Sequence, residues 1–214
     1  ARSHVILVSG KRGTGKSYTL GVIAEAICTM NRDEAQNICP LIFDTMGIFW
    51  TMKYKNQRDK DLLLKWGLEP QNVPVRVFAP FGFFQEYRDK GIDVDQEFAI
   101  RISELNSDDW VSLFELNFTN PVAVSVELSI SRLKEKKESF GFNDIRDEIR
   151  ALENTNEDVK NSAVALFDAA ETWGVFSEEK GTQIVDLVAP GQSTIIDLSM
   201  YSSIGVFNVR ALII

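Results

Sequence analysis

The chain has 214 residues, of which 44% are hydrophobic and 25% charged, and its formal net charge at pH 7 is −8. These are values of a globular protein that can bury a core, and no apolar run approaches the roughly 20 residues that span a bilayer. The acidic balance argues against a protein that coats nucleic acid non-specifically. A local basic patch can still bind DNA, because phosphate contacts act over about 8–10 Å.

The cysteines and the histidine limit which cellular compartment and which kinds of metal site are expected. Cys28 and Cys39 are the two cysteines. We expect buried free thiols in a reducing, cytoplasmic compartment, with a disulfide between them as the less favoured alternative. His4 is the single histidine, which excludes a site built from several histidines.

Residues 10–17 read Gly-Lys-Arg-Gly-Thr-Gly-Lys-Ser and match the phosphate-binding pattern G-x-x-x-x-G-K-S. The apolar run at residues 4–9 predicts a buried parallel strand before the motif. Residues 18–28 predict an amphipathic helix after it, with an apolar face of Leu20, Ile23, Ala24, Ile27 and Cys28. Strand, glycine-rich turn and helix together are the setting of a P-loop, which favours nucleotide binding over an ordinary tight turn.

The residue types in this motif suit the phosphates of a nucleotide. Gly10, Gly13 and Gly15 let the backbone curl so that its N–H groups point at a phosphate, and the helix N-terminus adds partial positive charge. Lys16 is expected to reach the β- and γ-phosphates, and the Ser17 hydroxyl to ligate Mg²⁺. The other members of the predicted binding set are Arg12, Thr14 and Tyr18.

A second strand, at residues 40–44, ends in Asp44. An acid at the carboxyl end of a strand in an open α/β sheet points towards the ligand crevice. Asp44 could bind Mg²⁺ through water or orient an attacking water, or it could cap the following turn, and both alternatives stay open. Residues 48–56 mix aromatics with lysines. They could contact a base or a phosphate backbone, but a loop pinned to the core by its aromatics is favoured.

The rest of the chain predicts an α/β fold with a mainly parallel sheet and a helical insertion at roughly 105–180. Residues 81–93 are expected to form a loop, and the α/β pattern returns from residue 181. The expected strands are 73–80, 98–102 and 193–199, and the expected helices are 59–66, a helix from 107, one from 121, 144–152, 157–173 and 204–214, the last capped by Ser202 and Ser203.

Asp197 ends the apolar strand at 193–199, as the acid of a Walker B motif does. Leu198 and Ser199 follow it, where P-loop motors usually carry a Glu that activates water. Either Asp197 is an acid of a modest Mg²⁺ site, or the Walker B strand lies beyond Ile214. The second alternative is favoured, because a closing helix implies another strand.

Residues 9–25 and 43–53, with a weaker echo at 189–199, resemble the archaeal and bacterial HerA-type ATPases of the FtsK–HerA superfamily. These are hexameric double-stranded DNA translocases with RecA-like cores. The resemblance implies ATP bound between subunits of a homo-hexamer. Lys16 and Ser17 would take the Walker A roles, and Lys16 and Asp44 would be the catalytic residues, with Asp44 also near the metal.

The resemblance further implies helicase activity in DNA repair, with a NurA-type nuclease that resects DNA ends. A neighbouring subunit would supply an arginine, for which Arg12, Arg150 and Arg210 are candidates. The family's N-terminal β-barrel and Walker B segment are expected to lie outside residues 1–214. We therefore expect this chain alone to bind nucleotide but to hydrolyse it weakly.

Two other classes of function compete with a DNA motor. Asp44 to Gly47 fits the D-x-x-G pattern of GTPase switches, although no guanine-reading Asn-Lys-x-Asp occurs. A nucleotide-dependent assembly module is the other alternative. A small-molecule kinase would need an arginine-rich lid, which the acidic and mixed insertion does not provide. A DNA motor needs local cations, for which Lys53, Lys55, Arg58 and Lys60 are the candidates.

Overall fold

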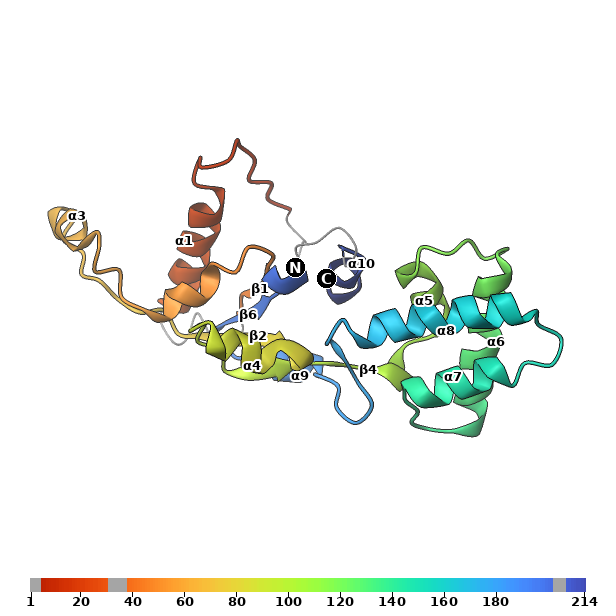
Figure 1. Cartoon of the computed structure of the whole chain (residues 1–214). Helices are drawn as coiled ribbons and strands as arrows, with labels where there is room; N and C mark the ends of the chain where they lie inside the picture. The colour runs from red at the N-terminus through yellow and green to blue at the C-terminus, as the bar shows by residue number, and fades with distance from the viewer. Residues whose placement is uncertain (1–4, 31–37, 202–206) are drawn as a thin grey trace.

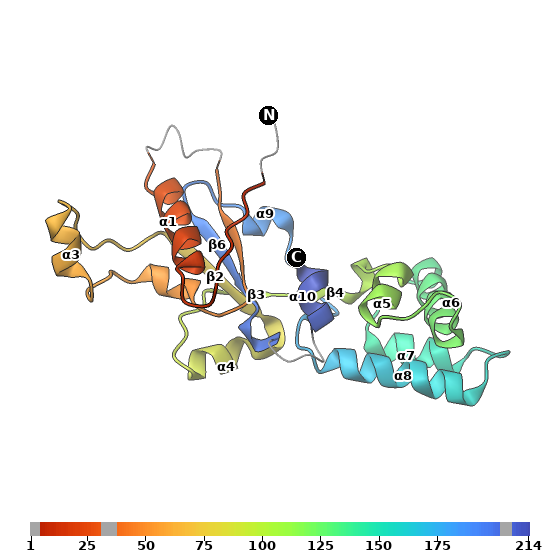
Figure 2. The same ribbon diagram turned by 90° about the horizontal axis from the view of Figure 1, so that it is seen from above.

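The computed structural model describes residues 5–30, 38–201 and 207–214. A parallel sheet with helices on both faces forms one part of the molecule, and a bundle of helices extends from it on one side (Figures 1 and 2). The predicted fold class, α/β with a mainly parallel sheet, is confirmed.

Four parallel strands form the sheet in the order β1-β6-β2-β3. Their bounds are Leu41–Asp44 (β1), Ser193–Asp197 (β6), Val75–Pro80 (β2) and Gln96–Phe98 (β3). The register of β1 and β6 pairs Asp44 with Asp197 at their carboxyl ends. Three of these strands lie where the apolar runs predicted them, because a strand that is covered on both faces reads as a continuous apolar run.

Successive side chains of β2 enter two different cores. Val75, Val77 and Ala79 pack on the side of α1 (Lys16–Cys28), η1 (Phe49–Lys53) and α4 (Phe84–Asp89). Phe78 packs on the side of α10 (Phe207–Ile213), in a core that continues into the helical bundle. The alternation places the carboxyl ends of β1 and β6 between two well-packed layers.

The helical lobe consists of α5 to α8, which occupy the stretch expected to be helical. Their bounds are Ser107–Leu113, Pro121–Lys136, Phe142–Arg150 and Glu157–Glu171. Asn120 caps α6 by accepting a hydrogen bond from the Val122 N–H at 2.9 Å. Trp110 fills the centre of the lobe, with its ring centroid 5.1 Å from that of Phe167 and 5.0 Å from that of Phe176.

Two short parallel strands, β4 (Ile100–Arg101) and β5 (Phe176–Ser177), join the lobe to the sheet (Figure 1). The remaining elements are η2 (Phe81–Phe83), η3 (Ile102–Glu104), α9 (Ile184–Leu187) and η4 (Ser199–Tyr201). A further helix, α3 (Lys60–Lys65), stands at the end of a long excursion between η1 and β2, far from the sheet in both views.

The predicted strand before the P-loop is not formed by its described residues, 5–9. Val5 and Leu7 are 97% and 87% exposed, and this run pairs with no strand in the described part of the chain. The run has no neighbouring strand to form hydrogen bonds with and no layer of helices to cover it. Its apolar side chains therefore give no free energy of burial that would favour a strand. The predicted apolar face of α1 is only half realised for the same reason, because Ala24 is buried whereas Leu20 and Ile23 are exposed.

Other expectations are corrected in detail. Residues 81–93, expected as a loop, contain α4, and the strand expected at 98–102 is split between β3 and β4. The proposed helix caps Ser202 and Ser203, like His4, lie outside the described residues. Among the described helices, none combines the length and the apolar character needed to cross a bilayer.

Candidate nucleotide-binding site

The P-loop has the backbone shape that its glycines predict. Gly13 and Gly15 have φ angles of +83° and +87°, in the left-handed region that favours glycine. A Cβ on Gly10 would lie 2.4 Å from Thr14 Oγ1 and would displace this hydroxyl from its bond to the Lys11 carbonyl. The loop is closed by hydrogen bonds from Thr14 N (3.3 Å) and Thr14 Oγ1 (2.8 Å) to the Lys11 carbonyl.

The start of α1 leaves a set of backbone donors free. No described residue accepts a hydrogen bond from the N–H groups of Gly13, Gly15, Lys16 or Ser17. Gly13 and Gly15 are exposed, whereas Lys16 and Ser17 are half-buried, so this side of the loop is open to solvent. Free N–H groups at a helix N-terminus, together with the helix dipole, make an anion-binding cradle. The geometry fits the phosphates of a nucleotide.

Lys16 lies across this loop. Its Nζ donates hydrogen bonds of 2.8 Å to the carbonyls of both Gly10 and Lys11. The ammonium group is thereby held beside the free N–H groups, where it would meet an incoming phosphate as a point charge. Ser17 and Tyr18 occupy the first turn of α1, and the Tyr18 side chain is exposed.

The Asp44 carboxylate holds the turn that follows β1. One oxygen accepts hydrogen bonds from the N–H groups of Met46 (3.0 Å) and Gly47 (2.9 Å), and the other accepts from Ile48 and Phe49, each at 2.7 Å. Hydrogen bonds to a charged group are each worth about 1.5–3 kcal/mol. This geometry favours the capping alternative for Asp44, and its metal and catalytic roles remain predictions.

Asp197 lies beside Asp44 and is fully buried. Its Oδ1 accepts hydrogen bonds from the Tyr87 hydroxyl and from the Ser199 N–H, both at 2.9 Å, whereas its Oδ2 is buried and has no partner among the described residues. Burial raises the pKa of Asp197 and the charge of Asp44 adds to this, whereas the bonds from Ser199 and Tyr87 act in the opposite direction.

Sequence reasoning missed Tyr87 in this cluster, because residues 81–93 were expected to form a loop. Possible i, i+4 partners could have indicated α4: Gln85 with Asp89, and Glu86 with Lys90, which form contacts of 2.8 and 2.7 Å. Burial and then the charge of Asp197 raise the pKa of Tyr87, so its hydroxyl stays protonated and donates to the carboxylate.

Arg210 joins the loops that follow β1 and β6. From α10 its Nη2 donates to the carbonyls of Thr45 (3.2 Å) and Leu198 (3.3 Å) of its own chain. The two other candidates for an arginine supplied to a neighbour lie elsewhere: Arg12 is exposed in the P-loop, and Arg150 is on α7, 3.3 Å from Asp147. A role for any of them between subunits remains a prediction.

The predicted site residues thus form two groups. One is the P-loop from Gly10 to Tyr18, and the other is the acidic cluster around Asp44. Neither Lys16 nor Ser17 makes a hydrogen bond or ion pair with Asp44 among the described residues. In the same part of the chain, no group of three or more His, Cys, Asp or Glu side chains is placed to hold a metal ion. The role of the Ser17 hydroxyl as a Mg²⁺ ligand stays a prediction.

Residues 48–56 adopt the alternative in which the loop is fastened to the core. Phe49 is buried, and Trp50 Nε1 donates to the Gly47 carbonyl at 3.0 Å. Lys53 Nζ lies 2.8 Å from Asp95 and 3.3 Å from Asp93, with its side chain 13% exposed. Lys53 is therefore paired within its own chain, and it is not one of the cations that are available to bind DNA.

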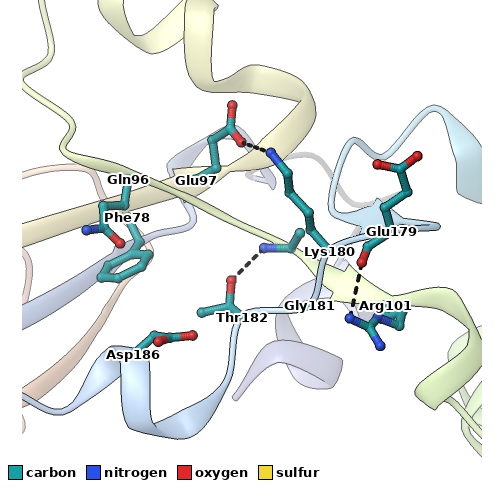
Figure 3. A pocket seen from close by; sticks show the side chains of 10 residues that line it. Phe78, Gln96, Glu97, Arg101, Glu179, Lys180, Gly181, Thr182 and Asp186 are labelled. Atoms are coloured by element: carbon teal, nitrogen blue, oxygen red, sulfur yellow. Dashed lines mark hydrogen bonds and ion pairs between the residues drawn. The ribbon is translucent and has the colours of Figure 1, made fainter.

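A hollow of about 370 Å³ lies away from the P-loop, where the helical lobe joins the sheet (Figure 3). Along the wall of this hollow, the segment that returns from the lobe is bound to the segment that leads into the lobe. Thr182 Oγ1 accepts from Ala99 N at 3.0 Å, Arg101 Nη2 donates to the Glu179 carbonyl at 3.1 Å, and Lys180 lies 3.9 Å from Glu97. These contacts fix the connection between the two parts of the molecule.

Comparison with known families decides which P-loop proteins this chain belongs with. The family described as "Helicase HerA, central domain" matches residues 2–211. The chain belongs to the HerA family. No curated protein and no solved structure matches it. The match spans the sheet, the helical lobe and the P-loop together, so the chain carries the P-loop ATPase core of a HerA-type protein. The HerA resemblance expected from residues 9–25 and 43–53 is confirmed.

Proposed function

We propose that this HerA-family chain is the ATP-binding core of a DNA translocase. The observation that carries the proposal is the P-loop cradle, in which free N–H groups and the Lys16 ammonium surround one exposed loop. When bound, Mg²⁺ would neutralise charge on the phosphates and polarise them. Lys16 would bind and orient the β- and γ-phosphates, and Ser17 would present its hydroxyl to the metal.

The role in DNA metabolism rests on the family and on the remaining free cations. Lys55, Arg58 and Lys60 make no ion pair among the described residues, in contrast to Lys53. They lie on the excursion between η1 and β2, which stands away from the sheet (Figure 1). We propose that these three cations contact the phosphates of double-stranded DNA. Within a homo-hexamer they would be repeated around the ring.

The wider proposal places this ATPase in DNA end resection with a NurA-type nuclease. It is supported by family membership and by the local basic residues, and it requires the intact protein. An assembly module that uses ATP without moving DNA is the second candidate. The large apolar side chains exposed on α3 and α9 favour it, because such surfaces mark contacts between proteins.

The test is ATP hydrolysis by the intact gene product, with and without blunt double-stranded DNA, and with Lys16→Ala as the control. The translocase proposal expects DNA to stimulate hydrolysis and Lys16→Ala to abolish it. Hydrolysis that depends on Lys16 but ignores DNA would support the assembly module. Preference for GTP over ATP in a competition assay would support a GTPase-like switch.

A further inference from the structure

The helix α10 stands between the sheet and the helical lobe in both views (Figures 1 and 2). Its Val209 is fully buried in the core that continues from the sheet into the lobe. Two polar side chains of the same helix, Asn208 and Arg210, bind different parts of the molecule. Because they are two residues apart, they project from nearly opposite sides of the helix, about 200° around its axis.

Asn208 binds the end of α5 in the lobe. Its Nδ2 donates a hydrogen bond to the Leu113 carbonyl at 3.2 Å and another to Glu115 Oε1 at 2.9 Å. Glu115 has a φ of +54°, and among the described residues it is the one non-glycine residue with a positive φ. The contact with α10 thus involves a residue whose backbone is unusual.

Glu115 occupies a position that ordinarily favours glycine. The helix α5 ends in a Schellman motif, in which the Glu115 N–H donates to the Ser112 carbonyl at 3.1 Å and the Leu116 N–H to the Val111 carbonyl at 3.0 Å. The left-handed backbone of this motif is costly for a residue with a Cβ. Glutamate supplies the carboxylate that binds Asn208, which glycine cannot. The contact with α10 therefore gives a physical reason for glutamate at this place.

Arg210 binds the turns on the other side of α10. Its bonds to the carbonyls of Thr45 and Leu198 reach the turns that follow β1 and β6. The turn after β1 is the one that the Asp44 carboxylate orders through four backbone N–H groups. One short helix thus holds the lobe on one side and this turn on the other.

The turn after β1 also packs on the P-loop helix. The Phe49 N–H is held by Asp44 at 2.7 Å, and the Phe49 ring lies beside Gly21 of α1, 3.8 Å from the place of a Cβ on that glycine. Ser17 precedes Gly21 by one helical turn on the same face of α1. A continuous chain of contacts therefore runs from the lobe through α10 to the start of α1.

We propose that α10 positions the turn after β1 beside the nucleotide site, and that the helical lobe sets this position through Glu115 and Asn208. Asn208 and Arg210 are then positioning residues that act within their own chain. Coupling is reciprocal, so ATP that stabilises the ordered turn also stabilises the contact of α10 with the lobe. This deepens the proposed function by naming how its site is regulated, and it rests on nucleotide binding by the P-loop.

Hydrogen exchange of the intact protein, with and without ATP and Mg²⁺, tests the coupling. In the wild type, ATP should slow exchange at residues 10–17, at 46–49 in the turn, and at 111–116 in the lobe. In Asn208→Ala the slowing at 111–116 should be lost while that at 10–17 remains. Slowing at 10–17 without slowing at 111–116 in the wild type would overturn the proposal. No slowing at 10–17 would count against the proposed nucleotide site itself.

A measurement without nucleotide tests the mechanical link separately. Asn208→Ala and Arg210→Leu should each speed exchange at 46–49, whereas Arg210→Lys keeps a donor and should restore most of the protection. Lys134→Ala, which loses a 2.7 Å bond to Asn106 at the other end of α5, is the matched control and should leave this turn unchanged. Equal exchange at 46–49 in wild type and Asn208→Ala would refute the link, whether or not ATP binds.

Glu115→Gly separates positioning from a general loss of stability. Glycine suits the left-handed backbone, so this variant should keep its fold although it loses the carboxylate that binds Asn208. Titration calorimetry should show ATP affinity reduced about 5-fold or more, the lower end of typical couplings between sites. Lys134→Ala should bind ATP like the wild type. Unchanged ATP affinity in Glu115→Gly would contradict the proposal.

Discussion

Asp44 and Asp197 are directly paired in register at the carboxyl ends of β1 and β6, and both are buried. Their environments differ sharply. Asp44 accepts four backbone hydrogen bonds, whereas Asp197 Oδ2 has no partner among the described residues. One acid therefore orders a turn, and the other is a buried carboxyl group whose charged form is poorly stabilised.

We predict that Asp197 makes the stability of the fold depend on pH. Because its pKa is raised in the folded state, the folded protein binds this proton more tightly than the unfolded chain does. The free energy of unfolding should therefore fall as pH rises from the ordinary Asp pKa of about 3.9 through the raised value. Asp197→Asn should remove this part of the slope and be the more stable protein at higher pH.

The measurement is urea unfolding of wild type and Asp197→Asn over a pH series. Each unit by which the pKa is raised corresponds to about 1.4 kcal/mol at high pH. Glu69→Gln, an exposed carboxyl without an ion-pair partner among the described residues, is the control. Parallel pH profiles for wild type and Asp197→Asn would show that Asp197 carries no such linkage.

Gly47→Ala should destabilise the fold through the turn that Asp44 caps. Gly47 has a φ of +66°, and an added Cβ would lie 2.8 Å from Ser199 Oγ and 2.9 Å from its Cβ. The left-handed backbone costs about 1–2 kcal/mol for an L-residue, and overpacking adds about 1–3 kcal/mol. Gly91→Ala has a similar φ of +75° and open space, so it should show the backbone cost alone. Equal losses in the free energy of unfolding would refute the clash.

Lys55, Arg58 and Lys60 should carry DNA affinity that Lys53 does not. Replacing these three with Ala should weaken DNA binding and reduce the dependence of log Kd on log salt by up to about three charges, with a slope of about 0.9 per phosphate contact. Lys53→Ala should leave this slope unchanged, because Lys53 is paired with Asp93 and Asp95. Fluorescence anisotropy with a labelled duplex, titrated with salt, measures both. An unchanged slope in the triple variant would exclude the excursion between η1 and β2 as the DNA contact.

Local sequence patterns predicted most of the elements that do not depend on contacts with segments distant in the sequence. The runs ending in Asp44 and Asp197 are covered on both faces, and the helices expected from residue 121 and at residues 157–173 form as α6 and α8. The run at residues 5–9 shows the limit of this reasoning, since an apolar segment becomes a strand only beside another strand.

The same distinction between local and long-range contacts applies to the candidate site. The glycine geometry and the placement of Lys16 follow from the P-loop motif itself. The contact of Tyr87 with Asp197 joins residues 110 positions apart, and the pairing of Lys53 with Asp95 spans 42. These contacts could not be predicted from the spacing of residues in the sequence, because they depend on how β1, β6 and α4 meet in space.

The central claim is that residues 10–17 bind a nucleotide. The most direct measurement is titration calorimetry of the protein with ATP and Mg²⁺, comparing wild type with Lys16→Ala and with Lys11→Ala as a matched control on the same loop. Loss of the Lys16 ammonium should weaken binding about 10- to 150-fold, the equivalent of about 1.5–3 kcal/mol, while Lys11→Ala changes it little. No ATP binding by the wild type, or equal affinity in Lys16→Ala, would contradict the account.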